Sequence, residues 1–185
     1  MFARHSDRVD TIAIRRWPGG VICSDRGVSV LPIDTERLHL RVMTVADAPA
    51  LAAYRTLPDV ARFQSWTVPF TVEQAEAMLV GQSDLTDVAP DDWVQIAIVR
   101  DGAVAGDIAV GLEGTQVATV GYTLHPDHQG KGFASEAVGA VVDALFAQGG
   151  VRRIQADTDP ANHASMRVIE SVGFRYEGRL RGTAV

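Results

Sequence analysis

"PDHQGKGFASEA", residues 126–137, places two glycines and the only lysine of the chain in one short bend, followed directly by an apolar run of helical periodicity. The segment before it, residues 117–124 (VATVGYTL), has the composition of a β-strand. A strand that enters a glycine-rich bend and then a helix suits anion binding, because the first amides of a helix lack intrahelical partners and glycines let an anion approach. An ordinary strand-to-helix turn has the same residue types, so the bend alone leaves both interpretations open.

Two other kinds of phosphate site are excluded by spacing. The sequence contains no G-x-x-x-x-G-K-[ST] motif, and no G-x-G-x-x-G follows its first expected strand. The bend therefore belongs neither to a P-loop nucleotide triphosphatase nor to a Rossmann dinucleotide site.

Strands and helices alternate along most of the chain. Asp101-Gly102 lies between two apolar runs and is a strong signal for a short hairpin, so residues 93–124 are expected to form an antiparallel meander. Thr44 and Thr71 are each followed three residues later by an acidic or amide residue, the pattern of a capping box at a helix start. The expected strands are 37–43, 93–99, 103–110, 117–124, 151–157 and 174–180, and the expected helices are 46–55, 75–81, 134–150 and 162–173. The pattern predicts the α/β class, with one mixed sheet flanked by helices.

Length and composition indicate a single globular domain. The chain has 185 residues, 46% of them apolar and 22% charged, which is enough for one hydrophobic core. No stretch approaches the ~20 apolar residues of a membrane helix, and the first ten residues are charged where a signal peptide is apolar. We therefore expect a cytoplasmic protein with no membrane partner. The single Cys23 excludes an internal disulfide and any CxxC metal site, so no metal is expected.

The charge of the chain is unevenly distributed. The net charge is −6, but residues 1–30 hold five arginines and three aspartates, which leaves 12 of the 17 basic and 20 of the 23 acidic residues for the remainder. This excess of acid argues against a nucleic-acid partner and favours a cationic one.

The bend also matches a family signature. Residues 129–134 (QGKGFA) fit the Q/R-x-x-G-x-G/A signature of the GCN5-related N-acetyltransferase (GNAT) superfamily. Three stretches fit the same family in the right order: TERLHLR at 35–41, VGYTLHPDHQGKGFASEA at 120–137 and NHASMRVIESVGFRYEG at 162–178. The chain resembles the branch that includes ribosomal-protein N-terminal acetyltransferases and related small-amine acetyltransferases. The resemblance implies a GNAT-like, mainly antiparallel sheet.

This resemblance implies a site for acetyl-CoA as cosubstrate. The pyrophosphate is expected on the amides of the bend, the pantetheine arm beside the preceding strand, and its thioester end near the start of the helix at 162. The implied cofactor-binding residues are Tyr122, Thr123, Leu124, Gln129, Gly130, Lys131, Gly132, Phe133, Ala134, Ser135 and Asn162.

Direct acetyl transfer to an amine needs an acid for the departing thiolate and a route for the proton of the amine. The resemblance assigns the acid to Ser165, the serine of the N-x-x-S pattern that begins at Asn162. Other family members use a tyrosine four residues further on, but Ile169 occupies that position here.

At the position of the general base, the sequence departs from the family pattern. Related sequences often have a glutamate just before the Gly-Tyr of the strand at 117–124, where this chain has Thr119 and Val120. Asp107 is the best remaining carboxylate, acting through water. Glu113 is a weaker candidate for the same role, and His125 and His128, both close to the bend, are expected at the surface. The structural alternative for Asp107 is a solvated strand or turn residue.

The resemblance extends from about residue 33 to the C-terminus. We therefore expect an N-terminal extension at residues 1–32 and an acetyltransferase domain at 33–185. Family members usually add one more strand after the GFRYEGRLRG stretch, whereas this sequence stops at Val185. An unpaired final strand would expose a sheet edge, so a homodimer is expected.

Two functions from different classes follow. The first is an enzyme that transfers the acetyl group of acetyl-CoA to a primary amine by direct attack in a ternary complex, the acceptor being a protein N-terminal amine or a small cationic amine. The second is a non-catalytic acyl-CoA-binding module, which the missing glutamate and tyrosine suggest.

Overall fold

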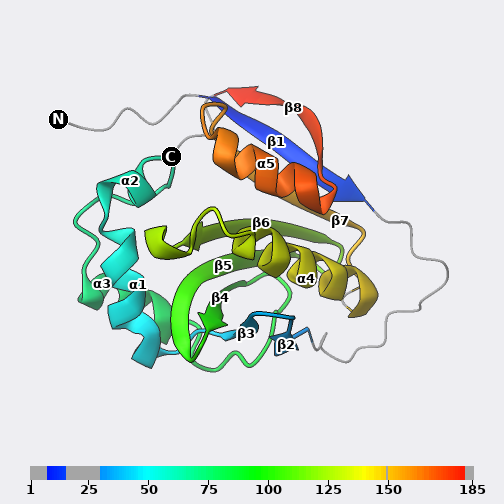
Figure 1. Ribbon diagram of the computed structural model, residues 1–185. Coiled ribbons are helices and arrows are strands. Elements are labelled where there is room, and N and C mark those ends of the chain that lie inside the picture. Colours follow the sequence, from blue (N-terminus) through cyan, green and yellow to red (C-terminus); the bar gives the residue numbers. More distant parts are fainter. Residues whose placement is uncertain (1–7, 16–29, 149, 182–185) are drawn as a thin grey trace.

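One sheet of eight strands forms the centre of the protein (Figure 1). The computed structural model describes residues 8–15, 30–148 and 150–181. The strand order is β2-β3-β4-β5-β6-β7-β1-β8, and all neighbours are antiparallel except the parallel pair β6 and β7. The strands are β1 (Arg8–Arg15), β2 (Ile33–Asp34), β3 (His39–Val42), β4 (Trp93–Arg100), β5 (Ala103–Glu113), β6 (Val117–Leu124), β7 (Arg153–Thr158) and β8 (Arg175–Arg181). The predicted α/β class with a mainly antiparallel sheet is confirmed.

Helices cover both faces of this sheet. Successive residues of β4 enter two different cores: Ile96 and Ile98 pack in the cluster that contains residues of α4, and Ala97 packs in the cluster formed by α1 and α3. Because successive side chains of a strand point to opposite faces, α4 and α1 lie on opposite sides of the sheet. The helices are α1 (Ala48–Arg55), α2 (Pro58–Ala61), α3 (Val72–Val80), α4 (Phe133–Gln148) and α5 (His163–Val172).

Local signals account for most element ends. Asp101 and Gly102, with φ of +50° and +80°, turn the chain between β4 and β5. At α3, the Thr71 hydroxyl accepts from the Gln74 amide at 3.3 Å, and the Gln74 side chain accepts from the Thr71 amide at 2.8 Å. This reciprocal pair is the expected capping box. The short helix α2 was not expected from the sequence.

The N-terminal segment contains a strand of the sheet. β1 pairs with β7 on one side and β8 on the other, and Ile12 at its centre is fully buried. The carboxylate of Asp10, itself buried, accepts a bidentate pair of hydrogen bonds from Arg179 at 2.6 and 3.0 Å. Residues 8–15 are therefore an inner strand, which corrects the expectation that residues 1–32 lie outside the domain as an extension. Residues 1–7 and 16–29 of that segment lie outside the described residues.

The position of β1 also means that the final strand, β8, is not left unpaired on both sides. β8 is paired along one side by β1 and is the outer strand of the sheet in the part of the chain that the structure describes. A bulge in its register near Thr11 and Ile12, and the charged side chains of Arg175 and Arg179, are features that disfavour pairing with a second sheet edge. A homodimer stays a prediction, and this edge gives it little support.

Among the described residues, no helix is long and apolar enough to cross a membrane.

The role of β1 can be tested by truncating its buried centre. Ile12→Ala should lower the free energy of unfolding by about 3 kcal/mol, because removal of a fully buried branched side chain loses its transfer energy and leaves a cavity. Val80→Ala, at a side chain that is 56% exposed, is the control and should change stability little. Urea unfolding measures both; equal midpoints for the two variants would mean that β1 is a loose extension.

Candidate active site

The parallel strands β6 and β7 pair only over their first halves. Their register includes Val117 with Arg153, Ala118 with Ile154 and Thr119 with Gln155, and no pairing is recorded beyond that point. The following residues of both strands, 120–124 and 156–158, line a cavity of about 460 Å³. The remaining walls come from α2, the segment after α2, the bend with the first turn of α4, and α5 from its start to Ile169. The divergence of two neighbouring strands therefore creates a cavity in which predicted residues meet.

The glycine bend lies at one end of this cavity. Gly130 and Gly132 have φ of +70° and +82°, a region that residues with a side chain rarely adopt. A Cβ placed on Gly130 would meet nothing within 4 Å, so the space beside the bend is open. The Gln129 side chain donates to the Leu124 carbonyl at 3.0 Å and ties the bend to the end of β6. The bend thus presents backbone amides at the start of α4 to open space, the arrangement that an anion requires.

Most of the predicted site residues come together here. Those that line the cavity are Tyr122, Thr123, Leu124, Gln129, Gly130, Ala134, Asn162 and Ser165.

The side chains of the other predicted residues have partners elsewhere. Lys131 donates its ammonium to the Asp127 carbonyl at 2.6 Å, and the Ser135 hydroxyl is 2.9 Å from that of Ser171. Phe133 is buried. For Lys131, Gly132, Phe133 and Ser135, a contact with the cofactor through backbone amides stays a prediction.

The first residues of the TERLHLR motif, in the turn between β2 and β3, brace the bend and α4. The Glu136 carboxylate accepts from the Thr35 hydroxyl at 2.6 Å and from Arg37 Nε at 2.6 Å, and Arg37 Nη1 also donates to the Lys131 carbonyl at 3.1 Å. Burial raises the pKa of Glu136, but hydrogen bonds from Thr35 and Arg37 outweigh it and hold that pKa below its ordinary value. Two guanidinium groups lie close to the Phe133 ring, that of Arg37 at 4.6 Å and that of Arg100 at 4.5 Å from its centre. This brace explains why a motif about 90 residues away in sequence belongs to the bend.

Ser165 lies beside a tyrosine hydroxyl. Tyr122 Oη is 2.8 Å from Ser165 Oγ and 3.0 Å from the Ser165 carbonyl oxygen. Asn162 caps α5 by accepting from the Ser165 amide at 3.1 Å, which orients the first turn of the helix. Burial raises the pKa of Tyr122 to about 12, although the hydrogen bond with Ser165 acts in the opposite direction. The phenol therefore stays protonated at neutral pH, and two hydroxyls form a connected pair in the cavity.

Asp107 is not a free carboxylate, and this corrects the expectation that it accepts a proton through water. It is 1% exposed and is not among the residues that line the cavity. Its oxygens accept from Tyr54 Oη at 2.5 Å, from Arg55 Nη2 at 2.7 Å and from Gln95 Nε2. A buried carboxylate whose charge is paired and whose oxygens are bonded has no access to the acceptor amine.

The weaker base candidate, Glu113, and the two histidines near the bend also lie away from the cavity lining. Glu113 ends β5 opposite Val117, at the turn into β6, and is exposed. His125 and His128 lie in the 3₁₀ turn after β6, where burial and the neighbouring His125 lower the pKa of His128. None of Glu113, His125 and His128 lines the cavity.

Two other carboxylates do line the cavity and were missed in the sequence. Asp59 comes from α2, and Asp157 comes from the half of β7 that pairs with β1 but no longer with β6. Asp157 Oδ1 accepts from the hydroxyl of Thr11 at 2.7 Å, so the N-terminal strand β1 contacts a residue of the site. The only sequence signal for Asp157 was its place at the end of an expected strand, which does not reveal that the strand diverges there.

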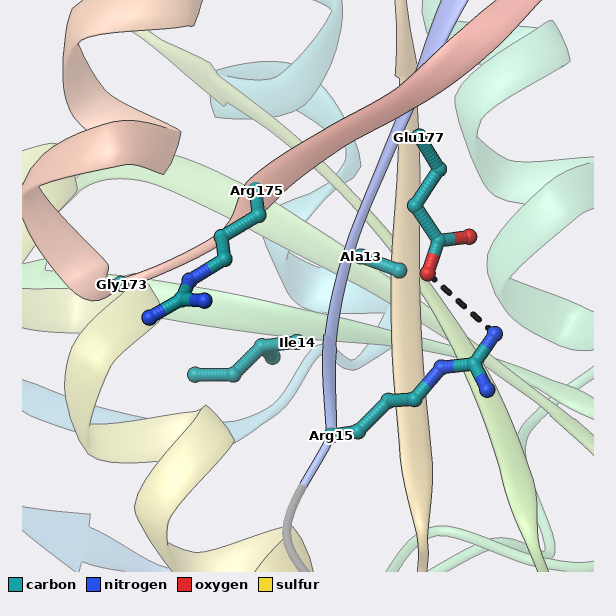
Figure 2. Close-up of a pocket in the computed structure, with 6 residues that line it drawn as sticks. All are labelled: Ala13, Ile14, Arg15, Gly173, Arg175 and Glu177. Atoms are coloured by element: carbon teal, nitrogen blue, oxygen red, sulfur yellow. Dashed lines mark ion pairs between the residues drawn. The ribbon is translucent and has the colours of Figure 1, made fainter.

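A second hollow of about 480 Å³ lies between β1 and β8, near the end of α5. Figure 2 shows its lining, which includes Ile14, Arg175 and the ion pair of Arg15 with Glu177 at 3.3 Å. None of the predicted site residues contributes to it.

Over residues 8–15, 30–148 and 150–181, no group of three or more His, Cys, Asp or Glu residues is arranged to hold a metal ion.

Comparison with known proteins identifies the family of the chain. The family model for the acetyltransferase (GNAT) domain matches residues 37–175. The uncharacterized N-acetyltransferase p20 of Bacillus licheniformis is 36% identical over 150 residues, which cover 80% of this chain and 84% of that protein.

Solved structures share the fold. An acetyltransferase of the GNAT family from Bacillus anthracis has a TM-score of 0.70 at 27% identity, over 80% of this chain and 86% of that one. Mycobacterium smegmatis RimJ, solved in complex with CoA-disulfide, has a TM-score of 0.66 at 21% identity, over 95% of this chain and 80% of that one. At that identity the second likeness concerns the fold alone.

The environment of Tyr122 predicts that its phenol ionises at a higher pH than an exposed tyrosine does. Because the folded-state pKa of about 12 lies above the ordinary value of ~10, the neutral phenol stabilises the folded protein fully below pH ~10, and this contribution is lost as pH rises toward 12. The tyrosinate absorbance that is present in the wild type and missing in Tyr122→Phe should therefore have its midpoint near pH 12. A midpoint near the ordinary value would show that Tyr122 is solvated.

Proposed function

Because the chain belongs to the GNAT family of acetyl-CoA-dependent N-acetyltransferases, we propose that it transfers an acetyl group to a primary amine by direct attack in a ternary complex. The observation that carries this proposal is the cavity between the diverging strands β6 and β7, which joins the glycine bend to the Tyr122–Ser165 hydroxyl pair. One elongated substrate can thus reach the anion site with its phosphates and the hydroxyl pair with its thioester.

The bend suits the pyrophosphate of acetyl-CoA. Its two glycines adopt left-handed φ values without a side chain, and the space beside Gly130 is open. The amides at the start of α4 supply donors, and the helix dipole favours negative charge there. The acetyl thioester, when bound, supplies the electrophilic carbonyl carbon and the thiolate leaving group.

We assign the protonation of the leaving thiolate to Ser165. The neutral amine attacks the thioester carbonyl, and collapse of the tetrahedral intermediate breaks the carbon–sulfur bond and expels the thiolate. When Tyr122 donates its hydrogen to Ser165 Oγ, the hydrogen of Ser165 is free to pass to the sulfur. Ser165 then takes the hydrogen of Tyr122, and the resulting tyrosinate is reprotonated by water, a step that its raised pKa favours at neutral pH.

The acceptor in this proposal is a cationic amine, either a protein N-terminal amine or a small amine. Two carboxylates, Asp59 and Asp157, line the cavity together with one basic residue, Arg167, so the charged lining carries a net charge of −1, which favours the ammonium form of the acceptor. The amine attacks only after it loses a proton, and either carboxylate, directly or through water, is placed to accept it. This role replaces the one expected for Asp107.

A thiol-release assay with a panel of amines tests the function. The panel contains a hexapeptide with an N-terminal alanine, spermidine, an aminoglycoside, and a primary amine whose low pKa leaves it uncharged at the pH of the assay. Turnover above the hydrolysis background, greatest for the cations, is expected. Binding of acetyl-CoA with no turnover of any amine would favour the non-catalytic acyl-CoA-binding module instead.

Gly132→Asp should sharply weaken acetyl-CoA binding, because it adds a negative charge to the bend where the pyrophosphate is expected. Gly102→Asp is a matched control: its φ of +80° is close to the +82° of Gly132, and it lies in the β4–β5 turn. Both variants suffer the same backbone strain, so calorimetric titration with acetyl-CoA isolates the effect of position. Equal affinities in the two folded variants would remove the bend from the cofactor site.

Ser165→Ala should lower kcat by ~10²-fold with little change in acetyl-CoA affinity, as expected when a general acid is lost. Ser171→Ala, in the same helix with its hydroxyl bonded to the Val168 carbonyl at 2.7 Å, is the control. Steady-state kinetics compares the two. An unaltered kcat in Ser165→Ala would exclude Ser165 as the acid.

A further inference from the structure

A buried polar cluster lies against the sheet on the face opposite α4. Its members are Tyr54, Arg55, Gln95 and Asp107, all between 1% and 9% exposed. Asp107 is the centre, since the other three residues each donate to it. Burial, and next the charge of Asp107, raise the pKa of Tyr54 far above its ordinary value, so this phenol is a permanent donor. The only full positive charge in the cluster is that of Arg55, and Asp107 fixes its position.

Arg55 connects this cluster to the segment that follows α2, residues 62–70. Its guanidinium carbon lies 4.3 Å from the centre of the Trp66 ring and 5.5 Å from that of Phe70. Trp66 Nε1 donates back to the Arg55 carbonyl at 3.0 Å, and the Phe70 amide donates to the Thr56 hydroxyl at 3.2 Å. The segment has no strand or helix of its own, so these contacts with the end of α1 hold it in place.

The same segment forms one wall of the cavity. Phe63 and Gln64 line it, next to Asp59 and Val60 of α2. Gln64 Nε2 also lies 3.4 Å from the hydroxyl of Thr123, which stands directly opposite Asp107 in the register of β5 and β6. A displacement of residues 62–70 would therefore move a wall of the cavity without touching the glycine bend.

This wall is on the acceptor side of the cavity. The bend, α4 and the start of α5 carry the residues proposed for the cofactor, whereas α1 and the segment after α2 pack on the opposite face of the sheet. In a ternary complex the amine must approach the thioester from the side that the cofactor leaves free.

We propose that Asp107 is a positioning residue for the acceptor: it holds Arg55, and the Arg55 guanidinium and carbonyl hold Trp66 and thereby the wall that contains Phe63 and Gln64. This inference rests on the proposed transfer to an amine. It assigns to Asp107 a role that is distinct both from general base and from mere support of the core.

The test compares variants along this chain of contacts. Asp107→Asn removes the charge that fixes Arg55. Trp66→Ala removes the contact at the other end, where the partly buried ring packs against the edge of the core. Trp66→Phe keeps a ring over Arg55 and is the conservative rescue. Trp93→Ala is the matched control, because Trp93 is 57% exposed at the start of β4, where its ring lies beside Gly111.

Hydrogen exchange of the amides in residues 62–70 gives the first measurement and needs no acceptor. Exchange in this segment should rise about tenfold in Asp107→Asn and in Trp66→Ala, because the segment opens locally, and should stay near wild type in Trp66→Phe and Trp93→Ala. Unchanged exchange in Asp107→Asn and Trp66→Ala would overturn the proposal. If Asp107→Asn does not fold, Trp66→Ala decides.

Kinetics with spermidine as the acceptor gives the second measurement. KM for spermidine should rise about tenfold in Asp107→Asn and Trp66→Ala, while the calorimetric affinity for acetyl-CoA changes by less than about twofold. The shape of the pH profile of kcat/KM should be retained. If Asp107→Asn left KM unchanged but abolished the fall of kcat/KM at low pH, Asp107 would be the base. That result would overturn the positioning role. A wild type that binds acetyl-CoA but acetylates nothing would refute the proposed function, and the exchange result would still decide whether Asp107 anchors the wall.

Discussion

The short parallel pairing of β6 and β7 is the constraint on which the site depends. Parallel neighbours that stayed paired to their ends would close the sheet, and the backbone groups of residues 120–124 would be used in ladder hydrogen bonds. Here pairing stops at Thr119 and Gln155, and the space between the strands becomes the cavity. The divergence has to be supported from both sides: β5 pairs with β6 along its whole length, and β1 pairs with β7 as far as Thr158. Each strand thus keeps one complete partner while it leaves the other.

The strand that supports β7 comes from the N-terminal part of the chain. β1 lies outside the residues that match the family model, yet it is an inner strand of the same sheet. Its contribution is both structural, through the buried Ile12, and local to the site, through the hydrogen bond of Thr11 to Asp157. If Asp157 accepts the proton of the amine, then β1 contributes to the function through the hydrogen bond that Thr11 donates to it.

The carboxylates in the core and those in the cavity have different proposed roles: the buried one positions other residues, and those in the cavity can accept a proton. The buried Asp107 must be paired, because an isolated charge in the interior is costly, and its pairing makes it useless as a proton acceptor. Asp59 and Asp157 line the cavity and remain candidates for proton transfer. The hydroxyls of Tyr122 and Ser165 take the proton-donating role in the proposed reaction, so acid and base come from different elements of the fold.

The sequence by itself determined the elements whose signals are local. The Asp101-Gly102 turn, the Thr71 capping box, the ends of α5 at Asn162 and Gly173, and the glycine bend at 129–134 all depend on residues within a few positions of each other, and each was predicted.

The tertiary structure alone decided which distant residues meet. Ser165 reaches Tyr122 across 43 positions, and Glu136 reaches Arg37 across 99. It placed β1 inside the sheet, and it buried Asp107 against Arg55, where the alternation of β5 left burial and exposure equally open. The physical reason is that a strand pattern specifies two faces but neither the neighbour of the strand nor the layer that covers each face. Those are set by the packing of the whole chain.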